Sequence, residues 1–484
     1  MRAFRSIVCS AFVFCLIVLT SCGSSTSVSG FTNFPGPTSP TSGGASPTPT
    51  PTPVGTTGGG SGAGNTGSGA GTNTPSTSQR ASIVYVSGTS EMFGNNSVQT
   101  TGFLDVRTLD PNSGALTPVQ GSPFTVNYAG AGDMALSPDG AHAYVIAEGT
   151  VGGSFVDSPS FLLVYSLDPN SGAPTLLQTL AAANPNAPGP SNVTVHPSGR
   201  FVYLSNDYQD NINNNGIGIF SVQSDGTLVF SGLGGIVQPQ FSYGAVIDPS
   251  GNFLFTASDG LPVGNLQNLA CGLFNSNVYA FHIDSASGAL TPVTGSPFTF
   301  QRNICEVGVA PQWLTLQIDS SGQHLFLADS GNRTVTVFSI DSSTGALTLL
   351  PGSTVDTGAG PSFDASAIDP QSDFLYVGGA SYSFTGFSFS PNQSTSDLAM
   401  LPGMPVQEIL SQVSNAGSRY MAVDPSGTFL FGNENEYTSA FSCCDPDQLV
   451  EFRIDPSTGA LTAMPSATVT LAGTVSKIVV APAH

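Results

Sequence analysis

Charged residues, and basic residues above all, are scarce in this sequence of 484 residues. Only 8% of the residues are charged, whereas about 25% is usual in soluble proteins. The 10 lysines and arginines stand against 31 aspartates and glutamates, which gives a net charge of −21. This excess of negative charge disfavours nucleic acids and anionic lipid surfaces as partners.

Long apolar runs are also missing, because the N-terminal stretch AFVFCLIVL at residues 11–19 is too short for an ordinary membrane span. It follows two arginines, as the apolar part of a signal peptide does. The next residues, Leu-Thr-Ser-Cys at 19–22, resemble a bacterial lipobox, whose cysteine is lipidated. We therefore expect a lipoprotein signal peptide at 1–21 and an extracytoplasmic protein, anchored through Cys22 to the outer membrane or cell surface. An ordinary signal peptide that ends near a cysteine is the alternative.

Residues 22–80 contain little besides Gly, Ser, Thr and Pro, and no charged residue occurs among them before Arg80. A segment of this composition cannot bury a hydrophobic core. We expect a disordered tether that follows the lipidated cysteine and holds a folded domain, residues 81–484, away from the membrane.

A turn motif recurs along the folded part of the chain. DPNSGALTPVQGSPF at 110–124 returns as DSASGALTPVTGSPF at 284–298, after 284 − 110 = 174 residues. The glycine of this turn recurs at Gly114, Gly172, Gly226, Gly288, Gly345 and Gly459, and a degraded copy lies at 396–398. The first step is 172 − 114 = 58 residues, so 174 residues are three periods. A fixed period of this length is typical of repeat folds.

Each period contains four short β-strands, which we name A to D. A DPSG-like turn separates strand A from strand B, as in HPSGRFVYLSN at 196–206. Strand C, such as TVTVFSID at 334–341, ends in the recurring turn, and strand D follows that turn. Seven such units predict an all-β fold, a seven-bladed β-propeller of four-stranded blades.

The two ends of the repeat region favour a closed ring. The region begins with a strand B, IVYVSG at 83–88, and ends with a strand A, SKIVVAPAH at 476–484. We expect this last strand to complete blade 1, which removes the exposed edges of an open array. Stacked β-sandwiches, the alternative, would not need this arrangement. The chain has one tryptophan and no Trp-Asp dipeptide, so it is not a WD40-type propeller.

The DPSG-(F/L)-(V/L)-(Y/F) runs and the V-x-V-F-x-I-D-x-x-TGALT units resemble the bacterial seven-bladed lactonase-like propeller family, with YVTN-like repeats. The family includes 6-phosphogluconolactonase-type enzymes and carboxymuconate-cyclase relatives. Its enzymes often carry a GPRH-type motif before a strand A and an Asn-Glu after a strand B. The matching positions here are Gly-Pro-Ser-Asn at 189–192, Ala-Pro-Gln-Trp at 310–313, Gly-Pro-Ser-Phe at 360–363 and Asn-Glu at 433–434. The resemblance implies lactone hydrolysis, although Arg and His are missing from these motifs.

The loops between strands B and C and between strands D and A share one face, and they are long and irregular. Long loops on a rigid scaffold are the usual place for function. On this face we predict catalytic residues Arg302, Arg333, Arg419 and Glu434, and ligand-binding residues Glu148, Glu306, Trp313 and Glu436. An arginine there could polarise a lactone carbonyl or bind a carboxylate. Isolated, solvated charges are the alternative interpretation.

Four cysteines of the folded domain would lie in an oxidising compartment after export. We expect disulfide bonds that involve Cys271, Cys305, Cys443 and Cys444, with Cys271–Cys305 and Cys443–Cys444 as one pairing. Cross-pairing and free thiols remain open, because four cysteines allow three connectivities. No cofactor or metal is expected. The asparagines at 211, 213 and 215 resemble the start of a calcium loop but lack its closing glutamate, so calcium is the weaker alternative.

These features predict a monomeric, membrane-anchored propeller that acts as a binding or interaction module through its long-loop face. Its partner would be a small molecule or a protein of the cell envelope. The alternative is a lactonase-like hydrolase that acts on an extracytoplasmic lactone. A lactone hydrolysis assay separates the two.

Overall fold

The computed structural model describes most of the propeller region. The described residues are 82–94, 97–149, 160–181, 190–206, 216–235, 244–262, 272–304, 314–330, 332–357, 365–379, 383–392, 395–407, 420–434, 446–464 and 468–482. The predicted signal peptide, the tether and all four cysteines of the folded domain lie outside them, as do the asparagines at 211, 213 and 215. None of the described ranges contains a helix that could span a membrane.

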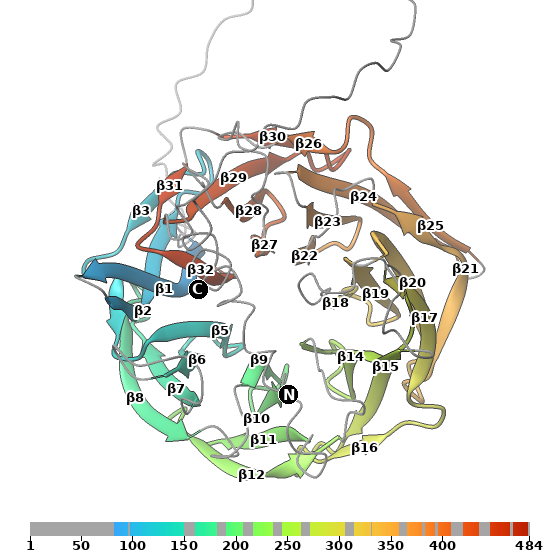
Figure 1. Cartoon of the computed structure of the whole chain (residues 1–484), viewed down its shortest axis with the longest axis horizontal. Coiled ribbons are helices and arrows are strands. Elements are labelled where there is room, and N and C mark those ends of the chain that lie inside the picture. The colour runs from blue at the N-terminus through green and yellow to red at the C-terminus, as the bar shows by residue number, and fades with distance from the viewer. Residues whose placement is uncertain are drawn as a thin grey trace, which may run out of the picture. The chain divides into compact units, whose positions relative to one another are not determined.

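The described strands form seven antiparallel sheets around a central channel, as predicted (Figure 1). In each sheet, strands A, B, C and D follow one another from the channel to the rim. Blade 1 consists of β32 (Thr474–Ala481), β1 (Ser82–Gly94), β2 (Ser97–Leu109) and β3 (Leu116–Pro118), with β4 (Phe124–Val126). Blade 2 consists of β5 (Gly130–Leu136), β6 (His142–Glu148), β7 (Ser160–Leu167) and β8 (Pro174–Ala181). Blade 3 consists of β9 (Pro190–Val195), β10 (Phe201–Asn206), β11 (Ile217–Val222) and β12 (Leu228–Gly234).

The other four blades repeat this order. Blade 4 consists of β13 (Ala245–Ile247), β14 (Phe253–Pro262), β15 (Gly272–Ile283) and β16 (Leu290–Pro292), with β17 (Phe298–Ile304). Blade 5 consists of β18 (Leu314–Ile318), β19 (His324–Asp329), β20 (Thr334–Ile340) and β21 (Leu347–Asp356). Blade 6 consists of β22 (Ala365–Ile368), β23 (Phe374–Gly379), β24 (Ser383–Asn392) and β25 (Thr395–Met400), with β26 (Val406–Gln407). Blade 7 consists of β27 (Met421–Val423), β28 (Phe429–Glu434), β29 (Gln448–Ile454) and β30 (Leu461–Ala463), with β31 (Val469–Thr470).

The C-terminal strand closes the ring as predicted. β32 pairs antiparallel with β1, from Ile83 opposite Ala481 to Thr89 opposite Thr474. The last strand of the chain is therefore strand A of the first blade. Closure pairs β1 on both sides, with β2 and β32, so that β1 is not an exposed edge strand.

The GSPF ending of the repeated motif interrupts strand D. In blade 1 both β3 and β4 pair with β2, and in blade 4 both β16 and β17 pair with β15. At the interruption the hydroxyl of Ser122 accepts a hydrogen bond from Val106 N at 2.8 Å. Ser296 accepts the equivalent bond from Ala280 N at 3.0 Å. A serine side chain thus replaces a ladder bond that the broken strand cannot provide.

The recurring turn between strands C and D also joins neighbouring blades. Asp110 Oδ1 accepts hydrogen bonds from the amides of Asn112 and Ser113, the local pattern that favours Asp in such turns. These bonds hold the pKa of Asp110 below its ordinary value. Gly172 of the equivalent turn has φ +73°, and its carbonyl accepts a 3.1 Å bond from the Tyr85 hydroxyl of the preceding blade. The turn therefore contributes to the blade interface as well as to chain reversal.

Candidate functional site

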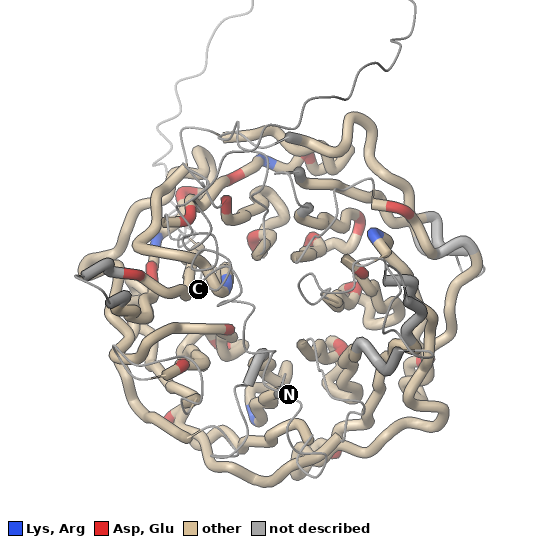
Figure 2. The backbone as a smooth tube through the Cα atoms, viewed as in Figure 1, with Lys and Arg blue, Asp and Glu red and all other residues tan. Residues whose placement is uncertain are grey.

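The single lysine of the chain lies in the central channel. Lys477 belongs to β32, and its Nζ forms a 2.8 Å ion pair with Oδ1 of Asp133 in β5. The lysine side chain is 34% exposed and that of the aspartate 9% exposed. In Figure 2 the basic residues are few and separated, whereas acidic residues occur around the whole ring. A cation is therefore rare in this molecule, and this one lies where a ligand of the channel would meet it.

β-Bulges place the polar side chains of the channel. The pairing of β5 with β6 shifts between Ala131 and Met134, so Asp133 lies within the irregularity. The pairing of β32 with β1 shifts directly beside Lys477, and that of β9 with β10 shifts directly beside Asn192. Bulges change the direction of side chains and are common next to active sites. Three consecutive blades carry one at the same level of strand A.

Hydrogen bonds connect this cluster across four blades. Asp133 Oδ2 accepts bonds from Asn192 Nδ2 and from Val193 N, both at 2.8 Å. Asn192 Oδ1 accepts a 3.0 Å bond from Ala245 N of blade 4. Because Lys477 occupies the other oxygen of Asp133, the cluster has a fixed geometry. Fixed polar groups of this kind stabilise charge that develops on a bound molecule.

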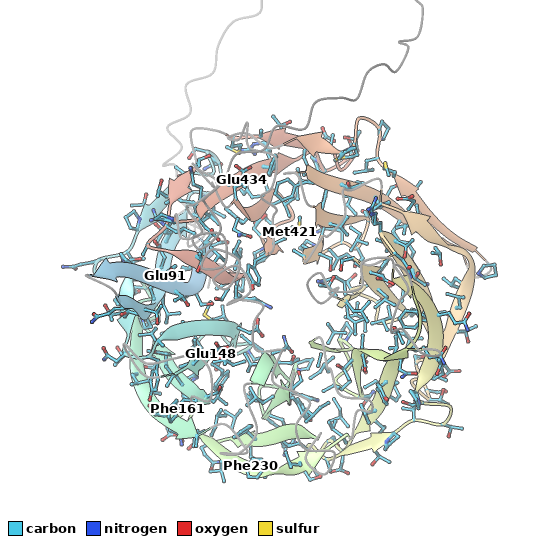
Figure 3. All side chains as sticks on the ribbon, in the orientation of Figure 1. Glu91, Glu148, Phe161, Phe230, Met421 and Glu434 are labelled. Atoms are coloured by element: carbon cyan, nitrogen blue, oxygen red, sulfur yellow. The ribbon has the colours of Figure 1, made fainter. Side chains whose placement is uncertain are left out.

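Glu148 lies at the end of β6, opposite Gly130 of β5. Its Oε1 is 3.6 Å from the position that a Cβ of Gly132 would take, so it lies over the bulge of β5. Figure 3 labels Glu434, Glu91 and Glu148, which come from blades 7, 1 and 2. Glu148 is the one of these three that lies over the residue adjoining Asp133.

A cavity of about 490 Å³ begins at the cluster. Lys477 and Asn192 line it, and strands A of blades 1 to 5 form its wall. It extends to the turns between strands A and B, where Pro138 and Pro197 line it. A site of this volume accommodates a small organic molecule.

The structure places only part of the predicted site. Glu148 is partly exposed beside the channel, Glu434 is 2% exposed at the end of β28, and Arg333 is exposed before β20 with φ +58°. Arg302 lies in β17, but its side chain is not described. Arg419, Glu306, Trp313 and Glu436 lie outside the described residues, as do Cys22, Cys271, Cys305, Cys443 and Cys444. The roles assigned to all of these residues remain predictions.

Lys477, Asp133 and Asn192 were not among the predicted site residues. Asn192 is the last residue of the Gly-Pro-Ser-Asn sequence that matches the family's GPRH-type motif. Lys477 lies in the segment predicted to be a strand A, and strand A lines the channel of a propeller. Because the only lysine of the chain lies in such a strand, its position in the sequence could have identified this site.

Comparisons with known proteins agree with the fold. Residues 103–297 match the family model Lactonase, 7-bladed beta-propeller. No curated protein matches the chain significantly. The periplasmic gluconolactonase of Pseudomonas aeruginosa is 17% identical with a TM-score of 0.58, and the match covers 83% of this chain and 100% of that one.

Two further solved structures are similar to the same extent. A candidate 6-phosphogluconolactonase of Bacteroides fragilis is 16% identical with a TM-score of 0.57, covering 84% of this chain and 99% of that one. A Lactobacillus plantarum protein is 17% identical with a TM-score of 0.57, covering 83% and 99%. Identities this low establish the fold alone. The predicted resemblance to the seven-bladed lactonase-like propellers is thereby confirmed.

Proposed function

We propose that this protein is a lactone hydrolase whose site is the channel cluster of Lys477, Asp133, Asn192 and Glu148. The observation that carries the proposal is the position of the chain's single lysine, which is paired and partly exposed in the lining of a cavity. The lactonase family match over residues 103–297 supports hydrolysis over other reactions.

Each residue has a role in the proposed reaction. A water oxygen attacks the lactone carbonyl carbon, while Glu148 accepts a proton from that water. The carbonyl oxygen becomes an oxyanion, which the Lys477 ammonium stabilises, and Asp133 holds Lys477 in place. When the ring carbon–oxygen bond breaks, the proton passes from Glu148 to the leaving alkoxide. The product is a hydroxy acid, whose carboxylate is attracted to Lys477.

The second candidate function is that of a binding module, which binds a ligand in the channel without hydrolysing it. The observation that favours it is the occupancy of Asp133, whose two oxygens accept an ion pair and two hydrogen bonds. A carboxylate engaged in this way does not serve as a base, so without proton transfer by Glu148 the cluster would only hold an anionic ligand at Lys477. The same assay separates the two functions, because a binding module shows affinity without hydrolysis.

The proposed location is extracytoplasmic, with Cys22 as the lipid attachment site. The lipobox-like sequence at 19–22 supports this. A Cys22→Ala variant expressed beside the wild type tests it: the variant should move from the membrane fraction to the soluble fraction. An unchanged distribution would contradict anchoring through this cysteine.

The function is tested by hydrolysis of a lactone panel by the purified full chain, with Lys477→Met beside it. Arg200→Gln is the matched control, because Arg200 is an exposed cation that donates to Ser285 O and Ala286 O, outside the channel. We expect turnover that Lys477→Met reduces about a hundredfold and Arg200→Gln leaves unchanged. Equal turnover in all three proteins would place the reaction elsewhere, and no turnover on any lactone would leave binding.

A further inference from the structure

A collar of seven aliphatic side chains surrounds the channel below the polar cluster. In blades 2 to 7 it is the last residue of strand A, and in blade 1 it is Val480, the residue before the last of β32. In every blade it pairs opposite the residue that precedes the central aromatic of strand B. The collar consists of Val480, Leu136, Val195, Ile247, Ile318, Ile368 and Val423, from blades 1 to 7.

The collar residues have the same surroundings in every blade. Each is partly exposed, and each packs against a different one of the seven hydrophobic core clusters. The five of them that line the cavity therefore have one side in the core and the other toward the channel. A purely structural core position would favour full burial, whereas these seven retain apolar surface that a ligand can cover.

The cavity connects the collar to the polar cluster. Five collar residues line it, together with Lys477 and Asn192. Lys477 precedes Val480, and Asn192 precedes Val195, by three residues of strand. At about 3.3 Å per residue, the polar and aliphatic parts lie roughly 10 Å apart along the channel. One cavity thus has a polar end, which contains Lys477, and an aliphatic end.

We propose that the substrate is a lactone that carries an unbranched aliphatic chain. This inference rests on the proposed lactone hydrolysis. The lactone carbonyl lies at Lys477 and the chain extends through the collar. The polar side chains of the lining at this level, Ser137, Thr194 and Gln317, already form hydrogen bonds within the protein. A sugar lactone would therefore place its hydroxyl groups against aliphatic side chains and lose part of their hydrogen bonds to water. An alkyl chain would instead bury apolar surface on both sides.

A chain-length series tests the substrate class. The full chain is assayed with δ-valerolactone, δ-hexalactone, δ-octalactone and δ-decalactone, and with glucono-δ-lactone. We expect kcat/KM to rise about fourfold for each added methylene, as complete burial of a methylene predicts. Glucono-δ-lactone should be the poorest substrate. A kcat/KM that is independent of chain length, or highest for glucono-δ-lactone, would overturn the inference while hydrolysis itself stands.

Near-isosteric variants locate the effect in the collar. Val195→Thr and Val480→Thr make the collar more polar at almost unchanged volume. Val229→Thr is the matched control, because Val229 is 53% exposed in β12 and outside the cavity. The collar variants should lose at least five times more kcat/KM for δ-decalactone than for δ-valerolactone, which has no chain, whereas Val229→Thr should change neither value. Equal losses on both lactones, or none, would contradict a role for the collar.

Binding measurements distinguish this inference from the proposed function. The affinity for δ-decalactone and for decanoate is measured by calorimetry on the wild type and both collar variants. If binding weakens in the variants and no lactone is hydrolysed, the proposed enzymatic function is wrong, and an aliphatic ligand in the channel is supported. If neither molecule binds and no lactone is hydrolysed, both proposals are wrong.

Discussion

Lys477 Nζ lies 2.8 Å from Asp133 Oδ1, and this ion pair joins the last strand of the chain to blade 2. Both residues lie at β-bulges, so the position of each depends on how its strand pairs with the next. The contact also lies at the closure of the ring, because β32 pairs with β1 in blade 1 and its Lys477 pairs with Asp133 in blade 2. Formation of the site is therefore coupled to completion of the ring.

The first prediction concerns the coupling of these two residues. Asp133→Asn should lower kcat/KM about tenfold, because it removes the charge that positions Lys477. The double variant Asp133→Asn/Lys477→Met should be no worse than Lys477→Met alone, since Asp133 acts through the lysine. A double-mutant cycle on lactone hydrolysis measures this. Additive losses would show that Asp133 has a role independent of Lys477.

The fold could be predicted from the sequence because the turn chemistry repeats. Asp, Ser and Gly at fixed positions set the turns, and the alternating runs between them set the strands. The site could not be predicted in the same way. Lys477 and Asp133 are 477 − 133 = 344 residues apart, and no repeated sequence motif marks the β-bulges that place them. The predicted site residues lie mostly in or beside the long loops, whereas the cluster lies on the strands that line the channel.

The second prediction uses the buried carboxyl of Glu451. The other six blades have an apolar residue or glycine at this position of strand C, opposite the central aromatic. Glu451 is 0% exposed and contacts Gly114 across the junction of blades 7 and 1. Within the described part of the chain its carboxyl oxygens have no hydrogen-bond partner. Burial raises the pKa of Glu451 to about 8, which Arg453 opposes and Asp424 reinforces.

A carboxyl whose pKa is higher in the folded state binds its proton more tightly there than in the unfolded chain. The contribution of Glu451 to stability is therefore present below pH 4.5 and is lost as the pH rises to about 8. Glu451→Gln should remove this loss and raise the free energy of unfolding at pH 9 by roughly 2–4 kcal/mol. Urea unfolding at pH 5 and pH 9 measures it. An equal gain at both pH values would rule out ionisation as the cause.

The third prediction compares two buried tyrosines at equivalent positions of strand B. Tyr376 donates a 2.9 Å hydrogen bond to Gly459 O of the next blade. Among the described residues, the hydroxyl of Tyr144 has no such partner. Tyr376→Phe should cost about 1–2 kcal/mol of stability, and Tyr144→Phe should be neutral or slightly stabilising. The urea midpoints of the two variants test this, and a similar loss in both would contradict a contribution from the interblade bond.

The last prediction separates backbone strain from interblade contact at two glycines with positive φ. Gly172 has φ +73°, and an added Cβ would lie 2.6 Å from Ile83 Cδ1 and contact the Tyr85 hydroxyl. Gly403 has φ +80°, but nothing lies within 4 Å of the equivalent position. Gly403→Ala should cost about 1 kcal/mol from backbone strain alone. Gly172→Ala adds a clash and disturbs the bond from Tyr85, so it should cost about 3 kcal/mol. Urea unfolding of both variants gives the comparison. Equal costs would mean that the recurring glycine serves the turn only, whereas the larger cost at Gly172 would show that each turn also fixes the spacing of neighbouring blades.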